Sequence, residues 1–309
     1  MEDLVPCEHQ VAGWHNGALS CVLKNKKGHI LKPVKLNANP TYDSSVSQPI
    51  KKDNAKETGC EELIPVCRDE REFYEKVRSS SKSDDVALKA LIPKYYGCQE
   101  VKKEDGSCIP HLILEDLAYG MVLPCVMDIK VGASQDYPNK GKVTNKSKYA
   151  TQDSHGFCLT GVRVFHPIES QLTLDLRPDS CKQFTTNEVF NALEVFIQQS
   201  FPFSKQLCES LIEGLQSVKN WILEQRSYKI RRGSILILYD AKDISDESPP
   251  ASLATSFING KDDQKQKPEQ LKVKVKMIDF AHVFQAFGEQ DNNYLVGLNK
   301  LIDFFSKFK

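Results

Sequence analysis

The sequence contains no long hydrophobic run, no Cys-x-x-Cys pair and no excess of charge of either sign. A membrane-spanning helix needs roughly 20 apolar residues in a row, and no window approaches that length. The first ten residues, MEDLVPCEHQ, are acidic and polar and lack the basic and apolar regions of a secretory signal. These absences predict a soluble protein of the cytoplasm, the nucleus or both, without a transmembrane segment.

The charge is balanced, because Lys and Arg together number 41 and Asp and Glu together also number 41. A balanced chain is unlike the basic domains that bind nucleic acid, so we expect no nucleic-acid partner. The 10 cysteines are scattered without metal-ligand spacing, which is typical of reduced thiols in an intracellular protein. The 309 residues, 40% hydrophobic and 27% charged, have the composition of a globular protein of one or two domains.

The first third of the chain has the pattern of a β-rich region. Two apolar runs within residues 18–34 flank the polar stretch Asn25–Gly28, which predicts a hairpin. Residues 36–60 are rich in Asn, Pro, Ser and Lys and predict a long loop. Residues 61–77 predict a helix, and residues 79–84 a second loop.

The rest of the chain mixes strands and helices. Apolar runs predict strands over residues 112–114, 125–127, 158–165, 234–239 and 271–277. In the last of these, apolar residues alternate with lysines, so one face is expected to be wet. Helices are predicted after the capping box Thr185-x-x-Glu188, over 207–222 and over 294–305. A β-rich part followed by a larger α+β part predicts two lobes with a ligand cleft between them.

Common catalytic signatures are missing. The sequence has no G-x-x-x-x-G-K-[ST], G-x-G-x-x-G, H-E-x-x-H or G-x-S-x-G motif, and neither H-R-D nor D-F-G. P-loop NTPases, Rossmann dehydrogenases, zinc proteases, α/β-hydrolases and ordinary protein kinases therefore lose support.

One motif does carry chemistry, in residues 124–132, PCVMDIKVG. Strand side chains repeat every two residues, so Asp128 and Lys130 point to the same side and can meet one ligand. A single D-x-K is often an exposed, salt-bridged strand end, but the full P-x-x-x-D-x-K-x-G pattern is far more specific. It resembles the signature of the inositol polyphosphate kinase family.

Further stretches support the resemblance in the expected order. They are GHILKP at 28–33, EREFY at 70–74, LEDL at 114–117, GSIL at 233–236 and IDFAH at 278–282. Met127 and the Phe-Ala-His continuation are most similar to the multikinase branch of the family.

The resemblance implies a two-lobed, protein-kinase-like α+β ATP-grasp fold. Residues 1–116 would form the β-rich ATP-binding lobe and residues 117–309 the α+β lobe, with a small helical inositol-binding insertion in 133–156. It also implies an ATP- and Mg²⁺-dependent kinase of soluble inositol polyphosphates. Inositol 1,4,5-trisphosphate and the tetrakisphosphate would be phosphorylated at the 3- and 6-hydroxyls, toward the pentakisphosphate.

The resemblance also implies roles at the nucleotide. Lys32 would bind ATP phosphates and be held by Glu70, with Glu72 as the fallback. Asp279 would ligate Mg²⁺. Asp128 would lie near the ribose and the reaction centre. Whether it binds the ribose or orients the attacking hydroxyl stays open.

Other implied contacts concern adenine and the inositol phosphate. Adenine would be met by the backbone of Glu115 and Leu117 and sandwiched by Ile30 and Ile278. The substrate phosphates would be bound by Lys130, Lys148, Arg163 and His282, with Lys130 also stabilising charge on the transferring group.

Two alternatives stay open. In the first, the chain is a dedicated inositol trisphosphate 3-kinase or a hexakisphosphate kinase. In the second, it is a non-catalytic inositide-binding scaffold. The retention of Lys32, Asp128, Lys130 and Asp279 argues against the scaffold. We expect a monomer, with phosphoinositide lipid head groups as a further ligand class.

Overall fold

A computed structural model describes residues 4–12, 22–34, 63–102, 106–133, 149–198, 204–245 and 271–309. In chain order the elements are β1 (Val5–Pro6), β2 (Leu23–Lys24), β3 (His29–Pro33), α1 (Glu70–Ser79), α2 (Ser83–Leu91), β4 (Tyr95–Lys102), β5 (Cys108–Glu115), β6 (Pro124–Val131), α3 (Gln152–His155), β7 (Phe157–Phe165), β8 (Leu172–Leu176), α4 (Pro178–Cys181), α5 (Thr186–Gln198), α6 (Ser204–Glu224), β9 (Tyr228–Ile230), β10 (Ser234–Asp240), α7 (Ala241–Ser245), β11 (Lys274–Ile278), β12 (Val283–Gln285), α8 (Asn292–Phe305) and η2 (Ser306–Phe308).

The first sheet is antiparallel and has the strand order β1-β2-β3-β5-β4. The predicted hairpin joins β2 to β3. The Asn25 side chain accepts the backbone N–H groups of Lys27 and His29 at 3.0 and 3.2 Å. Gly28 has φ +79°, a left-handed conformation that favours glycine, so turn chemistry fixes the register of this hairpin.

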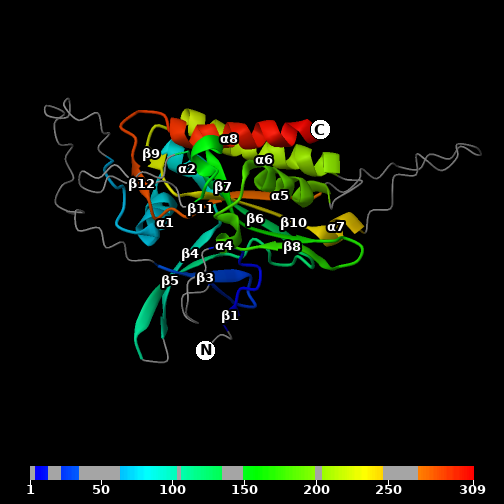
Figure 1. The fold of residues 1–309 in the computed structure, drawn as a ribbon. Coiled ribbons are helices and arrows are strands. Elements are labelled where there is room, and N and C mark those ends of the chain that lie inside the picture. Colours follow the sequence, from blue (N-terminus) through cyan, green and yellow to red (C-terminus); the bar gives the residue numbers. More distant parts are fainter. Residues whose placement is uncertain are drawn as a thin grey trace, which may run out of the picture.

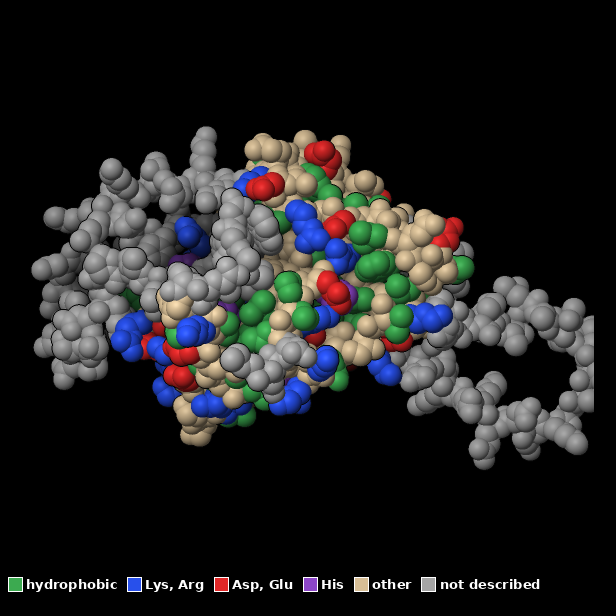
Figure 2. Space-filling model, turned by 90° about the horizontal axis from the view of Figure 1, so that it is seen from below, with side chains coloured by type: hydrophobic (Ala, Val, Ile, Leu, Met, Phe, Trp, Pro, Cys, Tyr) green, Lys and Arg blue, Asp and Glu red, His purple; other side chains and the backbone are tan. Residues whose placement is uncertain are grey.

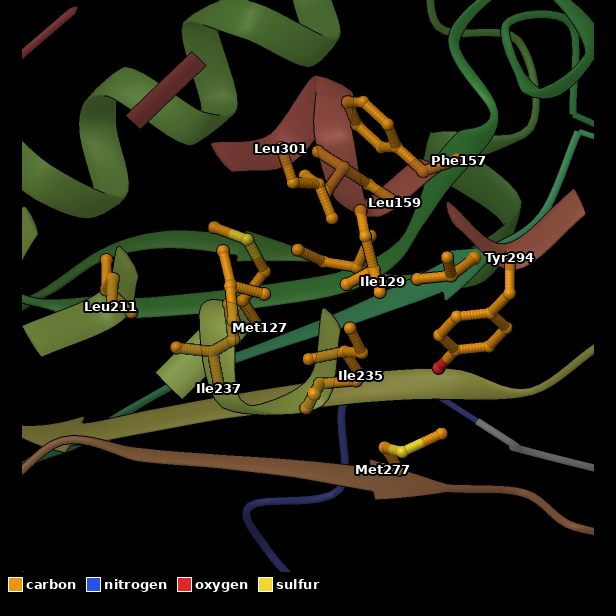
Figure 3. Close-up of a cluster of buried hydrophobic side chains, with 14 of the residues drawn as sticks. Met127, Ile129, Phe157, Leu159, Leu211, Ile235, Ile237, Met277, Tyr294 and Leu301 are labelled. Atoms are coloured by element: carbon orange, nitrogen blue, oxygen red, sulfur yellow. The ribbon is translucent and has the colours of Figure 1, made fainter. Parts of the chain in front are cut away.

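The second sheet, in the order β11-β10-β6-β7-β8, has two different faces. One face bears buried apolar side chains that form a single cluster with Leu211 of α6 and Leu301 of α8 (Figure 3): Met127, Ile129, Ile235, Ile237 and Met277. Directly opposed residues of antiparallel strands share a face. The register therefore puts Asp128, Leu236 and Lys276 in one row on the opposite face, which we call the site face.

Helices α5, α6 and α8 cover the apolar face of the second sheet, and the first sheet lies on the other side (Figure 1). The predicted capping box opens α5, because the Thr185 N–H donates to Glu188 Oε2 at 2.7 Å and the Glu188 N–H to Thr185 Oγ1 at 3.4 Å. Among the described residues, none of the helices combines the length and hydropathy needed to cross a bilayer.

Two local predictions were wrong. The helix expected over 61–77 begins only at Glu70, because Pro65 pairs with Phe284 in a β-bridge and Asp69 caps the helix by accepting the Glu72 N–H at 3.0 Å. The loop expected over 79–84 ends early, since α2 begins at Ser83. The predicted loop at 36–60 lies outside the described residues.

The α+β class is as expected, with a third, two-stranded sheet formed by β9 and β12, and the lobe boundary at 116/117 stays a prediction. Helix α2, which precedes this boundary, contacts helix α6, which follows it, because the Trp221 Nε1–H donates to Asp84 O at 2.9 Å. Of the expected insertion in 133–156, residues 134–148 lie outside the described residues, and α3 follows them. On the face shown in Figure 2, basic and acidic side chains are interspersed.

Residues 116–123, which we call the connector, join β5 of the first sheet to β6 of the second. The buried Asp240 carboxylate accepts the N–H groups of Val122 at 2.6 Å and Leu123 at 2.8 Å. It also accepts the Lys242 N–H at 2.9 Å. One carboxylate therefore fastens the end of the connector to β10.

Asp240→Ala should lower the free energy of unfolding by about 2–4 kcal/mol, because it leaves backbone donors without an acceptor. Urea denaturation measures this loss. Asp303→Ala, at an exposed position of α8, is the matched control and should stay within about 0.5 kcal/mol of the wild type. Equal stability of the two variants would contradict the role of Asp240.

Candidate active site

Lys32 joins three elements of the fold. Its Nζ lies 2.9 Å from Glu70 Oε1 and 2.5 Å from Asp279 Oδ1. Lys32 lies on β3, Glu70 opens α1, and Asp279 directly follows β11. Burial disfavours the charge of this lysine, but the Asp279 and Glu70 carboxylates outweigh burial and raise its pKa. The ammonium is therefore charged and fixed in direction, as phosphate binding requires.

Glu70 is held from a second side. Its Oε1 accepts the N–H of Phe280 at 3.1 Å, and the Phe280 ring stacks on Phe73 with 4.8 Å between centroids. Glu72 instead accepts from the backbone N–H and side chain of Arg68. The structure thus places Glu70 beside Lys32 and Glu72 elsewhere.

Asp128 is buried on the site face, close enough to Asp279 for the two charges to interact. Burial and the Asp279 charge raise the pKa of Asp128 from its ordinary 3.8 to about 6. The Thr160 hydroxyl of β7 opposes this rise, because it donates to Asp128 Oδ1 at 2.7 Å. Lys130, half-buried on the same face, opposes it as well. Ser234 of β10 lies opposite both Lys130 on β6 and Ile278 on β11, next to Asp279. The structure therefore brings Asp128, Lys130 and Asp279 together.

Asp279 has φ +67°, in the left-handed region that few residues other than glycine adopt. Such positions cost about 1–3 kcal/mol and concentrate at functional sites. The Asp279 side chain keeps 35% of its surface exposed, although Lys32 lies against it. A carboxylate that is aimed by its backbone and still accessible can meet a ligand.

Two of the positions predicted to meet adenine lie at the connector. Glu115 ends β5 with its carboxylate accepting the Lys94 N–H at 3.2 Å, and Leu117 lies in the connector. Ile30 shares a face of β3 with Lys32, and Ile278 lies in the same site-face row as Lys130. Their adenine contacts stay predictions.

A small apolar cluster, separate from the main core, also adjoins the site face. Its buried members are Val11, Leu117, Ala118, Val126 and Leu238. Sequence reasoning found only Leu117, because the cluster joins residues that are far apart in the chain. Thr160 was missed for the same reason, since a lone threonine in a strand has no sequence signal.

The predicted phosphate ligands are placed differently from one another. Arg163 is on β7, where its guanidinium donates to Glu8 O at 2.5 Å and to Asp175 Oδ2 at 3.2 Å. His282 follows Asp279 by three residues, and its carbonyl accepts the Arg231 N–H at 3.0 Å. Lys148 lies outside the described residues. The described contacts do not bring Arg163 to the Lys32 cluster, and the substrate roles of all three stay predictions.

Comparisons with known proteins show the family of the chain. A family profile described as "Inositol polyphosphate kinase" matches residues 111–306. The chain is 30% identical over 261 residues to inositol polyphosphate multikinase beta of Arabidopsis thaliana, which covers 76% of this chain and 79% of the relative. The chain belongs to the inositol polyphosphate kinase family. The expected family is therefore confirmed.

Further similarities agree with this membership. Inositol polyphosphate multikinase alpha of Arabidopsis thaliana is 27% identical over 256 residues, with 76% of this chain and 80% of the relative covered. The structure of an S. cerevisiae inositol phosphate multikinase, in complex with ADP and Mn²⁺, is similar in fold. Its TM-score is 0.55 at 23% identity, covering 80% of this chain and 98% of that one. The fold expected for the family is confirmed.

Glu70→Gln should lower kcat/KM for ATP by about 10- to 100-fold, because it removes a charged partner of Lys32. Steady-state kinetics with varied ATP measures the loss. Glu72→Gln makes the same change two residues away, where the partner is Arg68, and should leave kcat/KM within about twofold. If both variants lost activity equally, the Lys32–Glu70 contact would not be the cause.

Asp128→Asn should stabilise the metal-free protein at pH 7.5 by about 1–3 kcal/mol, because a pKa raised in the folded state makes the charged form costly. The folded state binds the proton more tightly, so the gain shrinks as pH falls through 6 and vanishes below 3.8. Urea denaturation from pH 7.5 to 5 measures the trend. Asp303→Asn is the control, and a gain independent of pH would contradict the assignment.

Proposed function

We propose that the chain is an ATP- and Mg²⁺-dependent kinase that phosphorylates soluble inositol polyphosphates, beginning with inositol 1,4,5-trisphosphate. The observation that carries the proposal is the convergence of Lys32, Glu70 and Asp279 beside Asp128 and Lys130. This set combines fixed cations with carboxylates, and phosphoryl transfer depends mainly on positioning and charge stabilisation.

The carboxylates fit a divalent cation. Asp128 and Asp279 repel each other, which a bound cation relieves. Among the described residues there is no cluster of three or more His, Cys, Asp or Glu ligands, and Mg²⁺ commonly takes one or two carboxylates and completes its shell with water and phosphates. A neighbouring fold holds ADP with Mn²⁺. Asp279 is the proposed ligand, and the bound ion would supply charge neutralisation between phosphates.

Each protein group has a defined task in the proposed reaction. Lys32, aimed by Glu70, would hold ATP phosphate oxygens. Lys130 would face the transferring phosphoryl group and stabilise the charge that develops there. Asp128, held by Thr160, would orient either the attacking hydroxyl or the ribose. An alcohol oxygen bonds to the γ-phosphorus, the bond between the γ-phosphorus and the β-phosphate oxygen breaks, and ADP leaves while the alcohol proton is released.

The finer substrate assignment is part of the same proposal. Phosphate joins the 3- and 6-hydroxyls in the route to the pentakisphosphate, with His282, Arg163 and Lys148 as candidate phosphate ligands. Phosphoinositide head groups are a further candidate substrate. We also propose a monomer of the cytoplasm or nucleus, which sedimentation and cell fractionation test.

Incubation of the protein with labelled ATP and individual inositol phosphates tests the function. We expect new phosphate on inositol 1,4,5-trisphosphate at positions 3 and 6, and Asp279→Ala should reduce turnover at least about 100-fold. Asp303→Ala should leave turnover unchanged. Phosphorylation of the hexakisphosphate alone, or of the 3-hydroxyl alone, would favour a dedicated kinase. Ligand binding without turnover would favour a scaffold.

A further inference from the structure

The lysines of β11 are not the solvated face that the sequence pattern predicts. Lys274 and Lys276 point to the site face, in rows with Leu238 and Leu236 respectively, and both are half-buried. Each ammonium donates a 2.6 Å hydrogen bond to a backbone carbonyl. Strand β11 therefore presents two lysines on the same face, and each lysine has a different hydrogen-bond partner.

The two partners lie in different elements. Lys276 bonds the carbonyl of Ala90, in the last turn of α2, where a cation is favourable. Lys274 bonds the carbonyl of Leu117, in the connector. Lys276 thus closes a helix end, whereas Lys274 holds the segment that joins the two sheets.

Among the described residues, the hydrogen bonds around Leu117 satisfy every backbone group of this segment that they reach except one donor, the Leu117 N–H. The peptide unit between Leu117 and Ala118 is held at both ends, because Lys274 binds its oxygen and Asp116 Oδ1 accepts its N–H at 3.0 Å. In the preceding unit, the Asp116 oxygen accepts the Tyr119 N–H at 3.1 Å. Within the part of the chain that the structure describes, no acceptor meets the Leu117 N–H. The connector therefore presents this N–H as a fixed donor.

The surroundings of this donor suit a flat, apolar ring. Leu117 and Ala118 pack with Val126 and Leu238 in the small cluster on the site face. Val126 is two residues before Asp128 on β6, so the cluster is one row from the proposed reaction centre. An apolar wall beside an N–H that has no acceptor is the kind of site that binds a heteroaromatic base.

We propose that Lys274 is the positioning residue of the base site: by holding the Leu117 carbonyl, it keeps the Leu117 N–H aimed at the nucleotide base. The inference rests on the proposed function, because it requires ATP as the co-substrate. N1 of adenine accepts a hydrogen bond, whereas N1 of guanine carries a hydrogen, so an aimed N–H selects adenine. Lys274 therefore sets both the affinity for ATP and the preference for ATP over GTP.

The test compares three variants of the full chain. Lys274→Met keeps the apolar stem but removes the donor, Lys274→Arg keeps a charged donor of similar reach, and Lys276→Met is the matched control on the same strand and face. Kinetics with ATP and with GTP give KM, kcat and the ATP-to-GTP ratio of kcat/KM. Calorimetry measures binding of a non-hydrolysable ATP analogue, and thermal unfolding establishes that each variant is folded.

For Lys274→Met we expect KM for ATP and the analogue Kd to rise about 3- to 10-fold. The ATP-to-GTP ratio should fall, while kcat and KM for the inositol phosphate change less than twofold. Lys274→Arg should recover most of the loss, and Lys276→Met should bind nucleotide as the wild type does.

Equal nucleotide binding by Lys274→Met and Lys276→Met would overturn the inference and leave the proposed function standing. A wild type that binds the analogue but never transfers phosphate would overturn the function, while the analogue Kd values still decide the role of Lys274. A wild type that binds no nucleotide would overturn both. If Lys274→Met does not fold, Lys274→Gln, with a shorter donor, takes its place in the binding comparison.

Discussion

One ammonium group, Lys32 Nζ, holds the site together. It bonds a carboxylate from helix α1 and another from the end of β11, so the first sheet, the helix and the second sheet meet at one charge. Burying a lysine is unfavourable unless carboxylates pair with it. The folded arrangement of these three elements is therefore also the arrangement that aims a cation. Stability and the proposed phosphate binding therefore depend on the same contact.

Side chains alternate between the two faces of the second sheet, so the residues that form the core are separated from those that form the candidate site. On β6, β10 and β11 one set of side chains fills the core beneath α6 and α8, and the interleaved set forms the site face. Asp128 has buried residues on both sides along the strand, at Met127 and Ile129. This packing holds its carboxylate in a place where the charge is costly, beside a second carboxylate. A site that is destabilising without its ligands is the usual result of placing like charges for function.

Sequence reasoning predicted what depends on local pattern. Apolar runs gave the strands, the capping box gave the start of α5, and the D-x-K spacing put Asp128 and Lys130 on one face. It did not predict features that depend on contacts between residues far apart in the chain. The choice of Glu70 over Glu72 follows from the rotation of α1 against β3, and the start of α1 from the pairing of Pro65 with Phe284.

The same limit explains the remaining differences. Lysines alternating along β11 have the pattern of a wet face, and only the neighbouring connector and α2 supply the carbonyls that these half-buried lysines bind. Thr160 and Val11 have no local pattern at all, since each is defined by a contact between distant strands or segments.

The most direct test of the central claim is the binding of Mn²⁺ followed by electron paramagnetic resonance, with and without ATP. The account predicts one tightly bound ion per chain that requires the nucleotide and is lost in both Lys32→Met and Asp279→Asn. Nucleotide-dependent Mn²⁺ binding that survives in both variants would show that the Lys32 cluster is not where the metal-bound triphosphate is held.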